Sequence, residues 1–229
     1  MRLAPPRRHG YRALFDCRPF RRLLPALVVS DIGDGMSLVA VAWLAVQLGQ
    51  PNPGPLVGAA VAAYVLPGAV GAVVLGRWLR RLPPHRLIQA NAWTRAAFLC
   101  AVPLAWVAGA LNPAMYVALL AASSVLHAWG GGARYALVAQ LLPGEQRLTA
   151  NALLSTSMWV SRIAGPALAG FLTVVVAPAW IIGVDALSFA ALAVQADEQL
   201  VEHRAEHVRA VASQRSRFAA HLVEARGQP

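Results

Sequence analysis

The stretch PGEQRLTANALLSTSMWVSRIAGPALAG, residues 143–170, decides the fold of this chain. A polar turn leads into a long apolar helix that carries one arginine, Arg162, near its middle. Around this arginine are small residues and a proline: Ser161, Gly165, Pro166, Ala169 and Gly170. Small residues let membrane helices approach closely, neighbouring helices make proline tolerable, and an intramembrane arginine usually faces the bundle interior. The stretch therefore predicts a membrane helix that packs on other helices around a polar site.

The composition excludes a soluble fold. Of 229 residues, 58% are hydrophobic and 13% are charged, whereas a soluble domain averages about 25% charged residues. The net charge of +10 comes from arginines, with no lysine, and these arginines lie in the gaps between apolar runs. They form no basic domain, so nucleic-acid binding is not expected. Cys17 and Cys100 lie in a basic segment and in an apolar run, and we expect neither a disulfide nor a metal site from them.

The apolar runs predict an all-α integral membrane protein, because a membrane-spanning helix needs roughly 20 apolar residues. Six spans are expected, at residues 23–48, 56–79, 87–108, 114–142, 148–176 and 180–195. The chain then divides into a basic N-terminal segment (1–22), a transmembrane domain (23–195) and a tail (196–229). The tail has a loose apolar stripe, which suits an amphipathic helix on the membrane face or the bundle. A solvated helical tail is the alternative.

The placement of arginines predicts the orientation of these spans. The N-terminal segment holds seven arginines, residues 77–86 around the second connection hold four, the fourth connection holds Arg147, and the tail holds five. The three other connections hold none. Under the positive-inside rule, both termini and the even-numbered connections are cytoplasmic.

Two aspartates in the first span are candidates for proton coupling or substrate binding. Asp31 and Asp34 lie about one helical turn apart and share a face. Asp34 is near mid-depth, where a carboxylate is costly and often functional. The alternative is an aspartate that only packs or caps a helix while paired with an arginine. We expect Asp34 to form an ion pair with Arg162 of the fifth span.

Other polar residues inside the predicted spans have simpler interpretations. Arg95 and Arg134 lie nearer the cytoplasmic ends and can extend their charge toward the surface. Asp185 lies near the start of the sixth span, where the helix dipole favours an anion and a structural role is expected. His127 suits a satisfied polar contact better than a proton relay. A triple glycine, residues 130–132, marks a bend or a close contact in the fourth helix.

A faint internal repeat links the second and fifth spans. LPGAVGAVVLG (66–76) and AGPALAGFLTV (164–174) each pair a proline with glycines at similar depth. The two spans run in opposite directions, as in an inverted repeat of three plus three helices.

No catalytic constellation is visible. The sequence has no helpful grouping of Ser, His and Asp, no metal-ligand spacing and no phosphate-binding loop. The triple glycine is followed by no Lys-Ser/Thr pair, so a P-loop is excluded. We expect no enzyme activity, no cofactor and no metal.

Several of these motifs resemble one transporter family. FRRLLPALVVSDIGDGMSLVAVAWLAVQL, PGEQRLTANALL, SRIAGPALAGFL and DALSFAALAV together resemble the N-terminal six-helix half of a major facilitator superfamily transporter. Within that family, the chain is most like the bacterial drug and siderophore exporters. The GPALAG stretch resembles the antiporter motif of the fifth helix, with Ser161 and Ala169 in place of two glycines.

The loop motif of that family falls between the second and third spans. Gly76, Arg81 and Arg86 fit its pattern, whereas Arg80 stands where the family has an aspartate. In the family this aspartate takes part in a conformational latch, so gating here should differ.

The resemblance implies proton-coupled export of small molecules across the bacterial plasma membrane. Family members have twelve helices, and their substrate cavity lies between two six-helix halves. We therefore expect this chain to work with a second six-helix half or a copy of itself. Two alternatives are a non-transporting membrane relic or assembly partner, and the membrane part of an ATP-driven transporter. The short connections argue against the latter.

Overall fold

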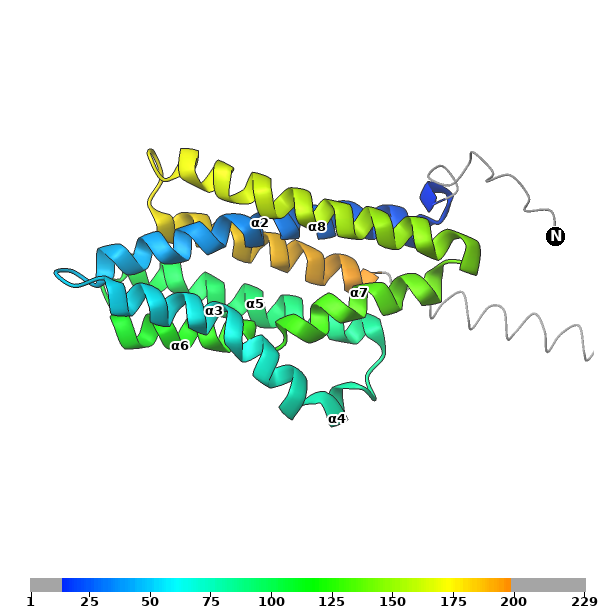
Figure 1. The fold of residues 1–229 in the computed structure, drawn as a ribbon, viewed down its shortest axis with the longest axis horizontal. Coiled ribbons are helices and arrows are strands. Elements are labelled where there is room, and N and C mark those ends of the chain that lie inside the picture. The colour runs from blue at the N-terminus through cyan, green and yellow to red at the C-terminus, as the bar shows by residue number, and fades with distance from the viewer. Residues whose placement is uncertain (1–13, 199–229) are drawn as a thin grey trace, which may run out of the picture. The chain divides into compact units, whose positions relative to one another are not determined.

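The structure is a computed structural model, and it describes residues 14–198. All regular elements among these residues are helices, which confirms the all-α prediction for this part of the chain. The elements are α2 (Arg18–Leu48), α3 (Gly54–Val74), α4 (Gly76–Leu79), α5 (Pro84–Val107), α6 (Pro113–Ser124), α7 (His127–Leu141) and α8 (Gly144–Leu172). A further helix, Pro178–Glu198, follows α8 and is drawn in orange in Figure 1.

The helices pack side by side as a bundle in which α2 contacts both α3 and α8 (Figure 1). On the other side of the bundle, α5 contacts α6 and α7, and α3 contacts α6. The Pro178–Glu198 helix packs on α2 through Asp185 and on α5 through Gly183, which lies against Pro103. Helix α2 thus has neighbours on several sides, and it carries both aspartates of the first predicted span.

The contact between α2 and α8 depends on two glycines. A Cβ atom added to Gly165 would lie 2.7 Å from the Cα of Gly35, and one added to Gly35 would lie 2.6 Å from the carbonyl oxygen of Ser161. Real Cβ atoms do not approach other atoms so closely, so the two backbones are in direct contact. This is the close approach that small residues permit between membrane helices.

The fourth predicted span is broken, and the break is not where the triple glycine suggested. Helix α6 ends at Ser124 and α7 begins at His127, whereas the three glycines lie inside α7. The hydroxyl of Ser124 donates to the carbonyl oxygen of Ala63 on α3 (2.9 Å) and to that of Ala121 one turn earlier (3.1 Å). Such hydroxyl bonds to the preceding turn favour bending of a helix.

The triple glycine does not bend the helix, and its first residue allows α7 to pack closely on α5. A Cβ atom on Gly130 would lie 2.8 Å from the Cβ of Asn91, while Gly131 and Gly132 have open space beside them. Gly130 therefore lets α7 lie close to α5 at the level of a buried asparagine.

Four helical stretches of the described part are long and apolar enough to cross a membrane, and α6 and α7 together make up the third: Arg18–Leu48, Gly54–Val74, Pro113–Leu141 and Pro178–Glu198. Helices α5 and α8 are not among them, and each carries arginines within its length. Large apolar side chains are nonetheless exposed on α8, including Ile163 (76%) and Phe171 (79%). Exposed apolar surface of this kind fits a lipid environment.

The predicted tail, 196–229, lies almost wholly outside the described residues, as does most of the basic N-terminal segment. The helical bundle carries the site described next.

Candidate functional site

A cavity of about 630 Å³ lies among α2, α3, α5, α7 and α8. Its volume falls within the roughly 300–1,000 Å³ that is typical of small-molecule sites. Its polar lining residues are Asp31, Asp34, Tyr64, Arg95, His127, Arg134, Tyr135 and Arg162. The cavity therefore gathers both aspartates of α2 with three arginines from three other helices.

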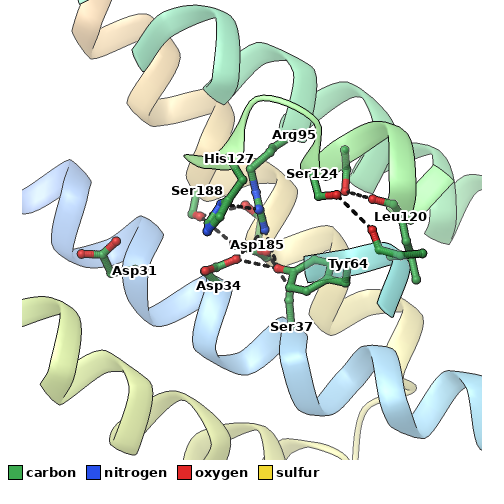
Figure 2. A network of polar contacts seen from close by, with 12 residues as sticks. Asp31, Asp34, Ser37, Tyr64, Arg95, Leu120, Ser124, His127, Asp185 and Ser188 are labelled. Carbon is green, nitrogen blue, oxygen red and sulfur yellow. Dashed lines mark hydrogen bonds and ion pairs between the residues drawn. The ribbon is translucent and has the colours of Figure 1, made fainter. Parts of the chain in front are cut away.

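Arg95 is the centre of the polar network (Figure 2). Its side chain is fully buried and forms an ion pair with Asp34. It also donates to the hydroxyl of Tyr64 and, at 2.8 Å, to Nδ1 of His127. The hydroxyl of Tyr64 in turn donates to Asp34 at 2.6 Å. Arg95, Tyr64 and Asp34 thus form a closed triangle contributed by α5, α3 and α2.

Aromatic rings complete the surroundings of this arginine. The guanidinium carbon of Arg95 lies 5.0 Å from the centre of the Tyr64 ring and 4.4 Å from that of the Phe189 ring. A guanidinium over an aromatic face is attracted by the ring quadrupole, and more strongly where water is excluded. The arginine is held by a carboxylate, a hydroxyl, an imidazole and two rings.

Two sequence-based expectations are wrong at this point. Asp34 pairs with Arg95, and not with Arg162. Arg95 does not extend its charge toward the surface, because its side chain is 0% exposed. The physical reason is the packing of the helices, which places the Arg95 side chain of α5 inside the bundle beside Asp34 of α2, so that the carboxylate offsets a charge that burial makes costly.

Arg134 also has a carboxylate partner. Its Nη1 atom lies 2.7 Å and 3.0 Å from the two carboxylate oxygens of Asp31. The two side chains are 13% and 10% exposed, respectively. Arg134 was expected to extend toward the membrane surface, whereas it is held inside the bundle by this pair between α7 and α2.

Arg162 is left without a carboxylate. Its guanidinium carbon lies 5.4 Å from the centre of the Trp159 ring, one turn earlier on α8. Within residues 14–198, the ion pairs that form at the cavity join the two aspartates to Arg95 and Arg134. Arg162 is exposed and lines the cavity.

Asp185 is buried more deeply than its place near a helix start suggested. Its side chain is 0% exposed and accepts a hydrogen bond from Ser37 of α2 at 2.7 Å. Ser188, one turn later on the same helix, donates to the backbone carbonyl of Asp185 at 2.7 Å and lies 3.3 Å from its carboxylate. A Cβ on Gly33 would lie 3.0 Å from the Ser188 hydroxyl, so that glycine makes room for this side chain. The hydrogen bond from Ser37 therefore ties Asp185 to α2 across the interface.

The tautomer of His127 follows from its partner. An arginine has only donors, so the Nδ1 atom that receives the bond from Arg95 must act as an acceptor. The ring proton then lies on Nε2, and the imidazole is neutral in this arrangement. A second positive charge beside Arg95 would oppose the ion pair with Asp34.

The two family motifs are only partly connected with the cavity. Of the fifth-helix motif, Pro166 lines the cavity, while Ser161, Gly165 and Ala169 are buried and Gly170 is exposed. Of the loop motif, Gly76 is buried against the ring of Trp129, and Arg80, Arg81 and Arg86 are exposed outside the cavity.

Sequence reasoning missed Tyr64, Ser37 and Tyr135. The hydroxyl of Tyr64 completes the triangle with Arg95, Ser37 bonds Asp185, and Tyr135 lines the cavity. Ser37 could have been found because it follows Asp34 by one turn on the same helix. Tyr64 stood out as the one hydroxyl side chain in an apolar helix, GPLVGAAVAAYVLPGAVGAVV.

A comparison with protein-family models finds a match to the Major Facilitator Superfamily over residues 23–224. The chain belongs to this family. Comparisons with curated proteins and with solved structures found no match.

Membership of the Major Facilitator Superfamily identifies a membrane transporter in general terms. Two carboxylates and three arginines line one cavity of this hydrophobic bundle, where each charge is costly to bury. Within residues 14–198, no group of three or more His, Cys, Asp or Glu side chains could hold a metal ion.

Proposed function

We propose that this chain is one six-helix half of a transporter that exports small molecules, such as drugs or siderophores, in exchange for protons. The observation that carries this proposal is the position of Asp34. Its side chain is 31% exposed at the cavity wall, yet it is paired with Arg95, which is fully buried. A proton can reach a carboxylate in this position from the cavity. Protonation of that carboxylate would change its ion pair with an arginine inside the bundle.

The chemistry of coupling follows from this pair. A proton that binds to Asp34 removes the negative charge that compensates Arg95. A buried charge without a partner is costly, so the contacts of Arg95 with Tyr64 and His127 would have to change. Loss of the proton would restore the pair, and the bundle would alternate between two arrangements.

The direct test is proton-driven transport in liposomes by the chain assembled with its partner, a second copy or a second six-helix half, under conditions in which the wild type transports. We expect Asp34→Asn to abolish movement of a substrate dye driven by a proton gradient, because the amide cannot take up and release a proton. Glu145→Gln is the matched control, since Glu145 is exposed at the start of α8 and outside the cavity. Equal transport by the wild type and by Asp34→Asn would rule out Asp34 as the coupling site.

We also propose six spans with both ends in the cytoplasm. This count includes α5 and α8, whose arginines are accounted for by the ion pair of Arg95 and by the cavity position of Arg162. It pairs the first three spans with the last three as an inverted repeat. A reporter active only outside the cytoplasm should be active at Asn52 and silent after Pro229. The reverse pattern would exclude this topology.

The proposed half needs a partner, either a second six-helix half or a copy of this chain. Transporters of this kind work by rocking one half against the other around a site at their interface. A single half supplies one wall, and polar groups facing lipid are costly. We expect gradient-driven transport only when a dimer or a second polypeptide is present. Transport by strictly monomeric chains would contradict this expectation.

A further inference from the structure

We propose that the cavity binds ligands with an anionic group on an apolar body, and that Arg162 holds the anionic group. This inference rests on the proposed function, because it takes the cavity as the transport site and names the class of its substrate. The inference is based on the positive charge in the cavity lining that no carboxylate of the bundle neutralises.

The cavity carries more positive than negative charge. Three arginines line it against two aspartates, and His127 is neutral when it accepts from Arg95. Asp34 and Asp31 are each used by one arginine, Arg95 and Arg134. The surplus charge therefore belongs to Arg162, the third arginine of the lining.

Arg162 has free hydrogen-bonding capacity. Its guanidinium carbon lies 5.4 Å from the centre of the Trp159 ring, and among residues 14–198 Arg162 forms neither of the cavity's ion pairs. Five donors in a planar fork suit two-point recognition of a carboxylate or phosphate group. The Nε atom of Arg134, which lines the same cavity from α7, is buried without a hydrogen-bond partner, which adds another unused donor to the lining.

The remaining walls suit an apolar body. Leu38, Val65, Ala128, Met158 and Pro166 line the cavity together with the ring of Tyr135. These side chains come from α2, α3, α7 and α8, so they surround the space next to Arg162. A ligand that is apolar over most of its surface and carries one acidic group matches both features.

The test is equilibrium binding of two near-isosteric probes, 2-naphthoate and 2-naphthamide, to the full chain in lipid nanodiscs without a gradient. Binding to protein-free discs is subtracted. We expect the chain to bind naphthoate at least about tenfold more tightly than naphthamide, a factor that corresponds to about 1.4 kcal/mol. Arg162→Gln should remove this preference, and Arg162→Lys should keep part of it because the charge is retained.

Arg77→Gln is the matched control, because Arg77 is exposed and lies outside the cavity while its loss changes the net charge equally. It should leave the preference unchanged. Equal binding of both probes, no naphthoate binding, or a preference that survives Arg162→Gln would each overturn the proposal.

Two further comparisons identify the source of the anionic group and separate this proposal from the proposed export. The anionic group could come from a lipid, so the assay is repeated in discs that contain phosphatidylglycerol. Weaker naphthoate binding there, seen in the wild type and absent in Arg162→Gln, supports the anion site and identifies lipid phosphate as its competitor. Unchanged binding supports a site for soluble anions. Because no gradient is used, loss of transport with retained naphthoate preference would contradict the proposed export alone.

Discussion

Helix α2 makes two kinds of contact with its neighbours. One is disrupted when side-chain atoms are added, and the other when a charged group is removed. Toward α8, Gly35 meets Gly165 backbone to backbone, and nothing can be added there. Toward α3 and α5, Asp34 meets Tyr64 and Arg95, and nothing charged can be removed there. One side of the helix depends on the absence of side-chain atoms, while the other depends on complete pairing of charges. The variants that follow test this difference.

The largest loss of stability is expected from Asp34→Ala. The change leaves the fully buried guanidinium of Arg95 without its carboxylate, and breaking a buried pair in this way costs about 3–5 kcal/mol. The measurement is the free energy of unfolding in mixed detergent micelles. The double variant Asp34→Ala/Arg95→Met should recover most of the loss, because no charge is then left unpaired. A double variant that is less stable than the single one would contradict this account.

The second-largest loss of stability is expected from a substitution at the contact between Gly35 and Gly165. Gly165→Ala should lower the free energy of unfolding by about 1–3 kcal/mol, because overpacking forces the two helices apart. A Cβ at this position would lie 2.7 Å from the Cα of Gly35. Gly170→Ala on the same helix is the control, since open space surrounds it. If both variants unfold alike, the close approach of α2 and α8 is not what stabilises their contact.

A smaller effect is expected from Asp31→Ala, one turn before Asp34. Its partner Arg134 keeps 13% of its side chain exposed, so some water can replace the lost carboxylate. The expected loss is about 1–2 kcal/mol, between the values for exposed and for fully buried pairs. The same micelle titration measures it beside Asp34→Ala. A loss that exceeds that of Asp34→Ala would reverse the ranking of the two pairs.

The smallest change is Tyr64→Phe, which removes one hydroxyl and keeps the ring against Arg95. The hydroxyl donates to Asp34 at 2.6 Å. A net hydrogen bond to a charged group is worth about 1.5–3 kcal/mol, and the lower end applies here because Asp34 is 31% exposed. We expect a loss of that size, with the ion pair intact. Tyr135→Phe is a comparison on α7, where the hydroxyl lies 3.2 Å from that of Ser155. A loss as large as that of Asp34→Ala would mean that the hydroxyl, and not the carboxylate, holds Arg95.

The sequence by itself determined the helical class and part of the charged lining of the site. Long apolar runs can satisfy their backbone hydrogen bonds in a bilayer only as helices or closed barrels, and their length and composition indicated helices. Charges within those runs are costly, so Asp31, Asp34 and Arg162 stood out without a structure. The small residues around Gly165 indicated a close contact, because no other feature explains them in a membrane helix.

Only the tertiary structure decided which charges are partners. Arg95, Arg134 and Arg162 are all arginines within predicted spans, and the sequence does not distinguish them as partners. Each could pair with Asp34 in some arrangement of the helices. The choice depends on how each helix is rotated and which neighbour it packs on, and the spacing of residues along one helix carries no information about that. The arrangement gives Asp34 to Arg95 and Asp31 to Arg134. It leaves Arg162 on the cavity wall beside Trp159, without a carboxylate partner among the described residues.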